Sequence, residues 1–279
     1  MVPRAIVVYS SGMPQSTSYA CALVTGASSG LGEEFALQLA PRVNHLVLVA
    51  RRDSLLQDLA GRLRERFPML GVSLFVADLT VPGERLRLVV ALAESGLVPD
   101  LLVNNAGLGD YGDFAAAEWP KLESMLRLNI EALTHLTHAL VPGMIRNGGG
   151  AIIQVSSLAS LLPIPDFAVY AATKAYVTSF AEALRIELRE HGIPVLAVCP
   201  GPVHTGFGEV ARRDETLPGI PAREWFYVPK QQVVAESLNA LSRNQARVYP
   251  GLKTAAAALV LSALPIVLLR LIMSSRPRK

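Results

Sequence analysis

The chain has 279 residues, of which 51% are apolar and 18% charged, and its formal net charge is +3. This length suits one large α/β domain, and no linker rich in Gly, Ser or Pro divides it. No basic patch interleaved with aromatic residues indicates nucleic-acid binding, and the two cysteines and five histidines lack metal-ligand spacing, so neither nucleic acid nor a metal ion is an expected partner.

The first nineteen residues contain one basic residue, Arg4, and a short apolar run, Ala5 to Tyr9. Because this run is too short for a signal peptide, we expect residues 1–19 to form a weakly ordered extension. Cys21 and Cys199 lie in apolar, strand-like runs and are expected to be buried, unreactive thiols. We therefore place the main part of the chain, residues 20–252, in a reducing cytoplasm.

Near-continuous apolar runs alternate with helical segments over residues 20–252, which predicts a single domain. Strands are predicted at Ala20–Thr25, His45–Ala50, Val72–Val76, Leu101–Asn104, Ala151–Ser156, Pro194–Val198 and Ala246–Tyr249. Helices are predicted at Glu33–Ala40, Ser54–Arg66, Glu84–Ser95, Trp119–Arg146, Val169–His191 and Lys230–Arg243. Strands that are apolar throughout are buried on both faces, so the pattern predicts an α/β fold with a Rossmann-like, doubly wound parallel sheet and helices on both faces.

A glycine-rich turn joins the first predicted strand to the first predicted helix, in the run Thr25 to Gly32. Glycines there allow a tight turn, and the helix N-terminus then offers free amides to a pyrophosphate. The predicted cofactor contacts in this turn are Gly26, Ser28, Ser29, Gly30, Leu31 and Gly32. The spacing differs from G-x-G-x-x-G, so an ordinary glycine-rich turn is the alternative.

Two arginines, Arg51 and Arg52, follow the second predicted strand, and an acid, Asp53, comes after them. At this point of a dinucleotide site an acid binds the ribose 2′-hydroxyl of NAD, whereas an arginine accommodates the 2′-phosphate of NADP. Asp53 is expected instead to cap the next helix. The order of the charges predicts that NADP(H) is preferred over NAD(H), although the arginines would also suit a solvated loop.

Tyr170 and Lys174 lie four residues apart on a predicted helix, and Ser157 lies thirteen residues before Tyr170. The i, i+4 spacing places phenol and ammonium on one helix face. A neighbouring cation favours the phenolate and lowers the pKa of a phenol, which suits proton exchange with an alcohol or ketone oxygen. By itself, the same spacing is also typical of a solvated helix face.

Together these features resemble the short-chain dehydrogenase/reductase family over roughly residues 20–205. The glycine turn is similar to its T-G-x-x-x-G-x-G motif, and Asn104-Asn105-Ala106-Gly107 is similar to its N-N-A-G motif. The segment Pro200 to Thr205 resembles the P-G-x-V-x-T sequence that closes over the nicotinamide. The residues that match the family's catalytic tetrad are Asn129, Ser157, Tyr170 and Lys174.

The resemblance implies a role for each tetrad member. The Ser157 hydroxyl would hold the substrate oxygen, since its spacing from Tyr170 selects it over Ser156. Tyr170 would exchange the proton, and Lys174 would bind the nicotinamide ribose and lower the pKa of Tyr170. Asn129 interrupts an otherwise good helix and would shape a water site that links Lys174 to solvent.

The resemblance also implies the remaining cofactor contacts. They are Asp78, Leu79, Asn105, Ala106 and Gly107 at the adenosine end, and Tyr170, Lys174, Pro200, Gly201, Val203 and Thr205 at the nicotinamide end. Asp78 would approach the adenine amino group, although a turn-forming aspartate fits the same pattern. Asn104 could instead brace the sheet.

The implied function is an NADP(H)-dependent oxidoreductase that transfers a hydride between the nicotinamide and a carbonyl or secondary alcohol. An apolar, lipid-like substrate is suggested by Leu161, Leu162, Pro163, Ile164, Phe167, Phe207, Trp225 and Phe226. One alternative is a non-catalytic NADP-binding sensor or scaffold, which would have no need of the tetrad. Another is a nucleotide-sugar epimerase or dehydratase, but such relatives carry T-G-x-x-G-x-x-G and a larger C-terminal substrate domain, which this chain lacks.

The C-terminal segment, residues 253–279, is apolar with a basic tail. Thr254 to Leu269 contains no charge, but it is marginal for a membrane span of about 17–25 residues, and Pro265 should bend or break a helix. The tail carries Arg270, Arg276, Arg278 and Lys279. We expect peripheral contact with the cytoplasmic face of a membrane, with packing on the domain or burial in a homo-oligomer as alternatives.

Overall fold

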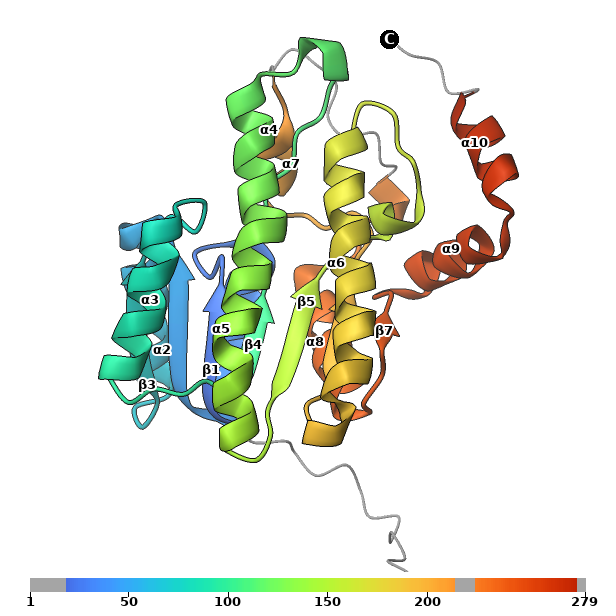
Figure 1. Ribbon diagram of the computed structural model, residues 1–279. Helices are drawn as coiled ribbons and strands as arrows, with labels where there is room; N and C mark the ends of the chain where they lie inside the picture. The colour runs from blue at the N-terminus through green and yellow to red at the C-terminus, as the bar shows by residue number, and fades with distance from the viewer. Residues whose placement is uncertain (1–18, 214–223, 275–279) are drawn as a thin grey trace, which may run out of the picture.

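The computed structural model describes residues 19–213 and 224–274 (Figure 1). The strands are β1 Tyr19–Thr25, β2 Val43–Ala50, β3 Gly71–Val76, β4 Leu101–Asn104, β5 Ala151–Val155, β6 Val195–Val198 and β7 Arg247–Val248. They form a parallel sheet in the order β3-β2-β1-β4-β5-β6-β7, which confirms the predicted doubly wound fold. The order reverses between β1 and β4, which is where such sheets bind ligands. Of the predicted N-terminal extension, residues 1–18 lie outside the described residues, and Tyr19 begins β1.

Helices cover both faces of the sheet. They are α1 Gly30–Leu39, α2 Asp53–Arg66, α3 Pro82–Glu94, α4 Trp119–Leu126, α5 Leu133–Arg146, α6 Ala168–Glu187, α7 Phe207–Ala211, α8 Lys230–Ser242, α9 Leu252–Ala263 and α10 Ile266–Ser274. In Figure 1, α3, α5 and α6 lie in front of the sheet, with α2 and α8 behind it. One apolar core includes Phe35 of α1, Leu56 of α2 and Val233 of α8, and the other includes Leu88 of α3 and Leu136 of α5.

The central strand β1 contributes to both cores because its side chains alternate in direction. Ala22 and Val24 lie in the core with α1, α2 and α8, whereas Cys21 and Leu23 lie in the opposite core. This double burial explains the near-continuous apolar runs. Burial also raises the pKa of the Cys21 thiol to about 12, as expected for an unreactive cysteine.

Two helix starts differ from the prediction. Helix α1 begins at Gly30, three residues before Glu33, because its first turn is part of the glycine motif. Asp53 is not the N-cap of α2, since that position belongs to Arg52, and the Asp53 carboxylate instead accepts a bond from Gln57 Nε2 at 3.2 Å.

The helix predicted at Trp119–Arg146 is continuous but not uniform. A π-helical turn, η3 Arg127–Ala132, separates α4 from α5. Such turns insert one extra residue per turn and are frequent at functional sites. Shorter 3₁₀ segments are η1 Ala40–Arg42, η2 Phe114–Ala116, η4 Leu158–Leu161, η5 Leu188–His191 and η6 Glu224–Phe226.

The C-terminal segment forms two helices that break at Pro265, as its sequence predicts. Helix α9 packs on the domain through Thr254, which is fully buried beside Gly201. Leu269 of α10 is also buried, but much of the outer surface of both helices is apolar and exposed, at Leu252, Leu259, Val260, Val267, Leu268 and Leu271. Over the described part of the chain, none of the helices has the length and apolar character that crossing a bilayer requires.

Candidate active site

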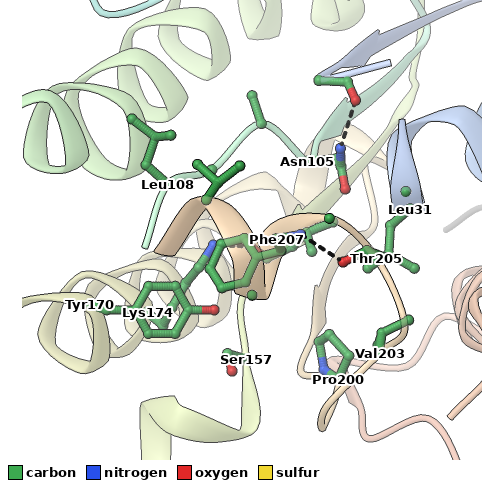
Figure 2. Close-up of a pocket in the computed structure, with 18 of the residues that line it drawn as sticks. Leu31, Asn105, Leu108, Ser157, Tyr170, Lys174, Pro200, Val203, Thr205 and Phe207 are labelled. Atoms are coloured by element: carbon green, nitrogen blue, oxygen red, sulfur yellow. Dashed lines mark hydrogen bonds between the residues drawn. The ribbon is translucent and has the colours of Figure 1, made fainter. Parts of the chain in front are cut away.

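A cavity of about 1080 Å³ opens at the carboxyl ends of the parallel strands. Of the predicted site residues, it is lined by Gly26, Ser28, Ser29, Gly30, Leu31, Arg51, Arg52, Asp78, Leu79, Asn105, Ala106, Gly107, Ser157, Tyr170, Lys174, Pro200, Gly201, Val203 and Thr205. The two other predicted site residues, Gly32 and Asn129, are not among the residues that line it. Segments from six strand ends therefore meet in one space. Figure 2 shows labelled side chains from four of them, those after β1, β4, β5 and β6, together with Tyr170 and Lys174 of α6.

The glycine turn is tightly packed and uses backbone conformations that favour glycine. Gly26 and Gly30 have φ angles of +66° and +60°, which other residues rarely adopt. A Cβ on Gly32 would lie 2.2 Å from the Gly26 carbonyl oxygen and 2.6 Å from Asn105 Nδ2. Asn105 Nδ2 donates to the Thr25 carbonyl at 2.9 Å and so ties the turn to the loop after β4. The turn thus holds the N-terminus of α1 against the cavity, in the arrangement that suits an anion.

The two arginines after β2 lie at the same end of the cavity. Arg52 Nη2 donates to Ser28 Oγ at 2.9 Å and to Ser29 Oγ at 2.6 Å, so its guanidinium lies over the glycine turn. Arg51 Nη1 lies 3.8 Å from Asp78 Oδ2, and its side chain is 58% exposed. Asp78 also accepts bonds from the Thr80 backbone N–H and hydroxyl, at 2.9 and 2.7 Å, so it forms a turn as well as lining the cavity.

Tyr170 and Lys174 share the opposite end, one turn apart on α6. Both are buried, and Lys174 Nζ lies 5.8 Å from the centroid of the Tyr170 ring and donates to the Val155 carbonyl at 2.9 Å. Burial raises the pKa of Tyr170 to about 12, against a smaller opposing effect of its hydrogen bond with Ser157. Burial lowers the pKa of Lys174 to about 8.

These directions correct one expectation. Spacing alone suggests that Lys174 lowers the pKa of Tyr170, whereas in the folded chain burial raises that pKa, and the hydrogen bond with Ser157 is the effect that opposes it. The phenol of the cofactor-free protein is therefore protonated at neutral pH, ready to donate.

The two serines after β5 have different partners. Ser156 Oγ donates to the Lys174 carbonyl and bonds Thr178 Oγ1, both at 2.7 Å, so it holds α6 against the sheet. Ser157 Oγ accepts the Ala159 N–H at 3.1 Å and reaches the Tyr170 hydroxyl. Figure 2 shows the Ser157 side chain and the Tyr170 hydroxyl on the same side of the cavity.

Asn129 lies in the π-helical turn and is 1% exposed. Its Oδ1 accepts the Leu108 N–H and its Nδ2 donates to the Leu108 carbonyl, both at 2.9 Å, and Nδ2 also donates to Thr173 Oγ1 at 3.0 Å. A Cβ on Gly107 would lie 3.4 Å from both Asn129 Oδ1 and Lys174 Nζ, so Gly107 lies beside both side chains. Asn129 therefore positions the loop after β4, and its role in a water site stays a prediction.

Asn104, in contrast, braces the sheet. Its Nδ2 donates to Thr137 Oγ1 of α5 at 2.9 Å, away from the cavity. These contacts support the interpretation that Asn104 braces the sheet.

Sequence reasoning missed part of the substrate end of the cavity. Tyr111, which it did not identify, lies 5.8 Å from Phe167, which stacks on Tyr170 at 4.2 Å, and Phe207 lies 5.4 Å from the same phenol ring. Tyr111 falls in a loop without periodicity, so no pattern marks it. Further lining residues without a sequence signal are Leu108, Arg212, Tyr227 and Met273.

Comparison with known proteins agrees with this geometry. The family model described as short chain dehydrogenase matches residues 20–216. A very-long-chain 3-oxoacyl-CoA reductase of Phaeosphaeria nodorum is 31% identical over 80% of this chain and 63% of its own length. The chain spans between half and two thirds of the length of the first such reductases that it matches.

Two solved structures with the same fold have sequence identities to this chain that are close to that of the Phaeosphaeria nodorum reductase. A short-chain dehydrogenase from Sphingobium yanoikuyae in complex with NADPH is 32% identical, with a TM-score of 0.76 over 93% of this chain and 97% of that one. A bulky-bulky ketone specific alcohol dehydrogenase from Comamonas testosteroni is 29% identical, with a TM-score of 0.72 over 93% and 95% of the two chains. The chain belongs to the short-chain dehydrogenase/reductase family of oxidoreductases.

Proposed function

We propose that this protein is an NADP(H)-dependent oxidoreductase that transfers a hydride between the nicotinamide and a carbonyl or secondary alcohol of an apolar substrate. The observation that carries the proposal is the meeting, in one cavity, of a buried, protonated Tyr170 with Ser157, Lys174 and the glycine turn. The cavity supplies a proton donor at one end and a site for a pyrophosphate at the other.

The lining residues fit a dinucleotide. The glycine turn and the N-terminus of α1 would hold the pyrophosphate, and Lys174 with the segment Pro200 to Thr205 would hold the nicotinamide half. Bound there, the nicotinamide supplies or accepts the hydride, which no side chain can do. Arg51 and Arg52 would contact the 2′-phosphate, because no acid precedes them at the end of β2 and a guanidinium matches a phosphate. These charges support a preference for NADP(H).

In the reducing direction, the Tyr170 hydroxyl donates its proton to the carbonyl oxygen while Ser157 hydrogen-bonds that oxygen. A positioned general acid of this kind contributes about 10²–10⁴-fold in rate. With a pKa of about 8, Lys174 carries its proton at neutral pH and stabilises the phenolate that forms. Asn129 keeps the loop after β4 in place beside both groups.

The substrate end supports an apolar substrate. Six of the eight apolar residues singled out from the sequence line the cavity, namely Leu162, Ile164, Phe167, Phe207, Trp225 and Phe226. Pockets with mostly apolar walls and few polar groups bind apolar ligands and orient them through those groups. The names of the relatives, a very-long-chain 3-oxoacyl-CoA reductase and a bulky-bulky ketone dehydrogenase, are consistent with this substrate class.

The exposed apolar surface of α9 and α10 supports peripheral contact with an anionic lipid surface on the cytoplasmic side. Leu259, Val267 and Leu271 are each more than half exposed. No acid occurs after Glu236, while Lys253 and Arg270 are followed by three further cations in the last four residues. Apolar area and positive charge on one short segment favour anionic bilayers. Met273 of α10 also lines the cavity, which would place the substrate entrance beside the lipid.

A screen of aliphatic, aromatic and steroid-like ketones, followed by the absorbance of NADPH, tests the proposal. Carbonyl-dependent oxidation of NADPH by the wild-type chain, lost in Tyr170→Phe, is the expected result. A chain that binds NADPH tightly but turns over no carbonyl or alcohol would instead be the NADP-binding scaffold.

A further inference from the structure

An arginine that the proposed chemistry does not use lines the substrate end of the cavity. Arg212 directly follows α7 and is half-buried. Its Nε is buried and has no hydrogen-bond partner among the described residues. Buried donors are almost always paired in native proteins, so this donor indicates a partner that the described part of the chain does not supply.

The neighbouring charges are already paired. Asp110, 4% exposed, accepts bonds from Arg213 Nε at 2.9 and 3.1 Å and lies 3.4 Å from Lys121 Nζ. Glu209, the acid closest in sequence that lines the cavity, is exposed, and it meets Arg212 only through the backbone, where the Arg212 N–H donates to its carbonyl at 3.3 Å. Within residues 19–213 and 224–274, no ion pair involves Arg212, so its charge is available to a ligand.

The backbone that carries Arg212 is fixed. Lys121 Nζ donates to its carbonyl at 3.0 Å, and the Tyr111 N–H donates to the carbonyl of the preceding Ala211 at 2.9 Å. A side chain on an anchored backbone needs less ordering when it binds. The Arg212 backbone is thus held at the cavity by contacts within the chain.

Aromatic rings connect Arg212 to the reacting centre. Tyr111 pairs with Arg212 in a short parallel bridge, and its ring contacts Phe167, which stacks on Tyr170. The rings of Tyr111 and Phe167 thus form a chain of contacts between the segment that carries Arg212 and the Tyr170 ring, and all of these residues line the cavity. That arrangement matches a molecule with a carbonyl, an apolar body and an anionic end.

We propose that Arg212 determines specificity by binding an anionic group of the substrate, a carboxylate or a phosphate, beyond its apolar portion. The guanidinium offers paired N–H donors to either group. This inference rests on the proposed hydride transfer, and it narrows the substrate from an apolar carbonyl compound to an amphipathic, anionic one.

The first test uses medium-chain oxo fatty acids, with the ketone at increasing distance from the carboxylate, and the methyl ester of each. With the full chain and NADPH, kcat/KM for the best acid should exceed that for its ester about ten- to a hundredfold, the usual effect of a charge-assisted hydrogen bond. Arg212→Gln should bring the ratio close to unity, and Arg212→Lys should retain part of it. Arg189→Gln, at an exposed arginine of η5, should leave it unchanged.

A second pair, an oxoacyl-CoA and its neutral N-acetylcysteamine thioester, distinguishes phosphate from carboxylate. If the preference for the fatty acid over its ester depends on Arg212, the bound anion is a carboxylate. If the preference for the CoA thioester over the neutral thioester depends on Arg212, the bound anion is a phosphate. Acid and ester reduced equally well by the wild type, together with no preference for the CoA thioester, would overturn the proposal, as would preferences that persist in Arg212→Gln.

Binding without turnover separates this inference from the proposed function. Trp225 lines the same cavity, so its fluorescence can report binding of saturated fatty acids and their methyl esters. If no carbonyl is reduced, but acids bind more tightly than esters and this difference requires Arg212, the proposed hydride transfer is refuted and the proposed anion site is supported. If ketones are reduced but acids and esters bind equally, the anion site alone fails.

Discussion

Replacing Tyr170 by phenylalanine removes one hydroxyl from the centre of the cavity and keeps the ring. That ring stacks on Phe167 at 4.2 Å and lies 5.4 Å from Phe207, and phenylalanine retains both contacts. The loss is the hydrogen bond with Ser157, and a neutral bond of this kind contributes about 0.5–1.5 kcal/mol to stability. The free energy of unfolding should therefore fall by no more than about 1.5 kcal/mol.

The effect on turnover should be much larger. Loss of a general acid lowers the rate by about 10²–10⁴-fold, which corresponds to roughly 3–5 kcal/mol of transition-state stabilisation. NADPH affinity should change little, because the phenol lies at the reacting end of the cavity and the glycine turn at the other. Carbonyl-dependent NADPH oxidation, NADPH titration and urea unfolding measure the three quantities on the same preparations.

Tyr176→Phe is the matched control. Tyr176 lies on the same helix and its hydroxyl bonds Thr134 Oγ1 at 2.8 Å, but it is 37% exposed and outside the cavity. It should retain wild-type turnover. Tyr170→Phe with near-wild-type activity would refute the proton-donor role, and equal losses in both variants would show that the hydroxyls act through the packing of α6.

Three further changes have defined outcomes. Arg51→Ala with Arg52→Ala should weaken NADPH binding about ten- to a hundredfold more than NADH binding, and equal losses by titration would show that these arginines do not contact the 2′-phosphate. Lys174→Met should abolish turnover yet raise the free energy of unfolding of the cofactor-free protein at pH 7 by about 1–3 kcal/mol, because burial lowers the pKa of Lys174 to about 8. Between about pH 8 and the ordinary lysine pKa of about 10.4, the wild-type chain binds the Lys174 proton only when it is unfolded, so its free energy of unfolding rises with pH. The advantage of the variant in urea titrations should therefore shrink over this pH range. A variant that is less stable than the wild type at pH 7 would contradict this prediction. Val267→Asp with Leu271→Asp should abolish cosedimentation with phosphatidylserine vesicles while leaving turnover of a water-soluble ketone intact, whereas a change in oligomeric state on gel filtration would identify a second copy as the partner.

Much of the fold follows from the sequence because apolar side chains mark strands buried on both faces. The prediction is weaker where tertiary contacts decide the local conformation. Helix propensity suggests one uniform helix around Asn129, but the bonds from its amide to Leu108 stabilise a π-helical turn instead. Propensity also places the start of α1 too late, because Gly30 and its neighbours are poor helix formers that the cofactor turn requires.

The site is predicted as a set of positions but not as an electrostatic environment. Motif spacing places Tyr170, Lys174 and Ser157 together, yet only the fold shows that burial raises one pKa and lowers the other. Arg212 has no motif, since its importance comes from contacts with Tyr111 and Lys121, which lie roughly ninety to a hundred residues earlier in the chain. Sequence spacing cannot reveal contacts of that range.

Transfer of deuterium from NADPH that carries deuterium at both C4 positions of the nicotinamide tests the central claim most directly. The wild-type chain, incubated with the best ketone of the screen, should form an alcohol that carries one deuterium at the former carbonyl carbon, detected by mass spectrometry. The label should be absent with Tyr170→Phe over the same time. Unlabelled product, or bound NADPH that is never oxidised by any carbonyl, would contradict hydride transfer by this protein.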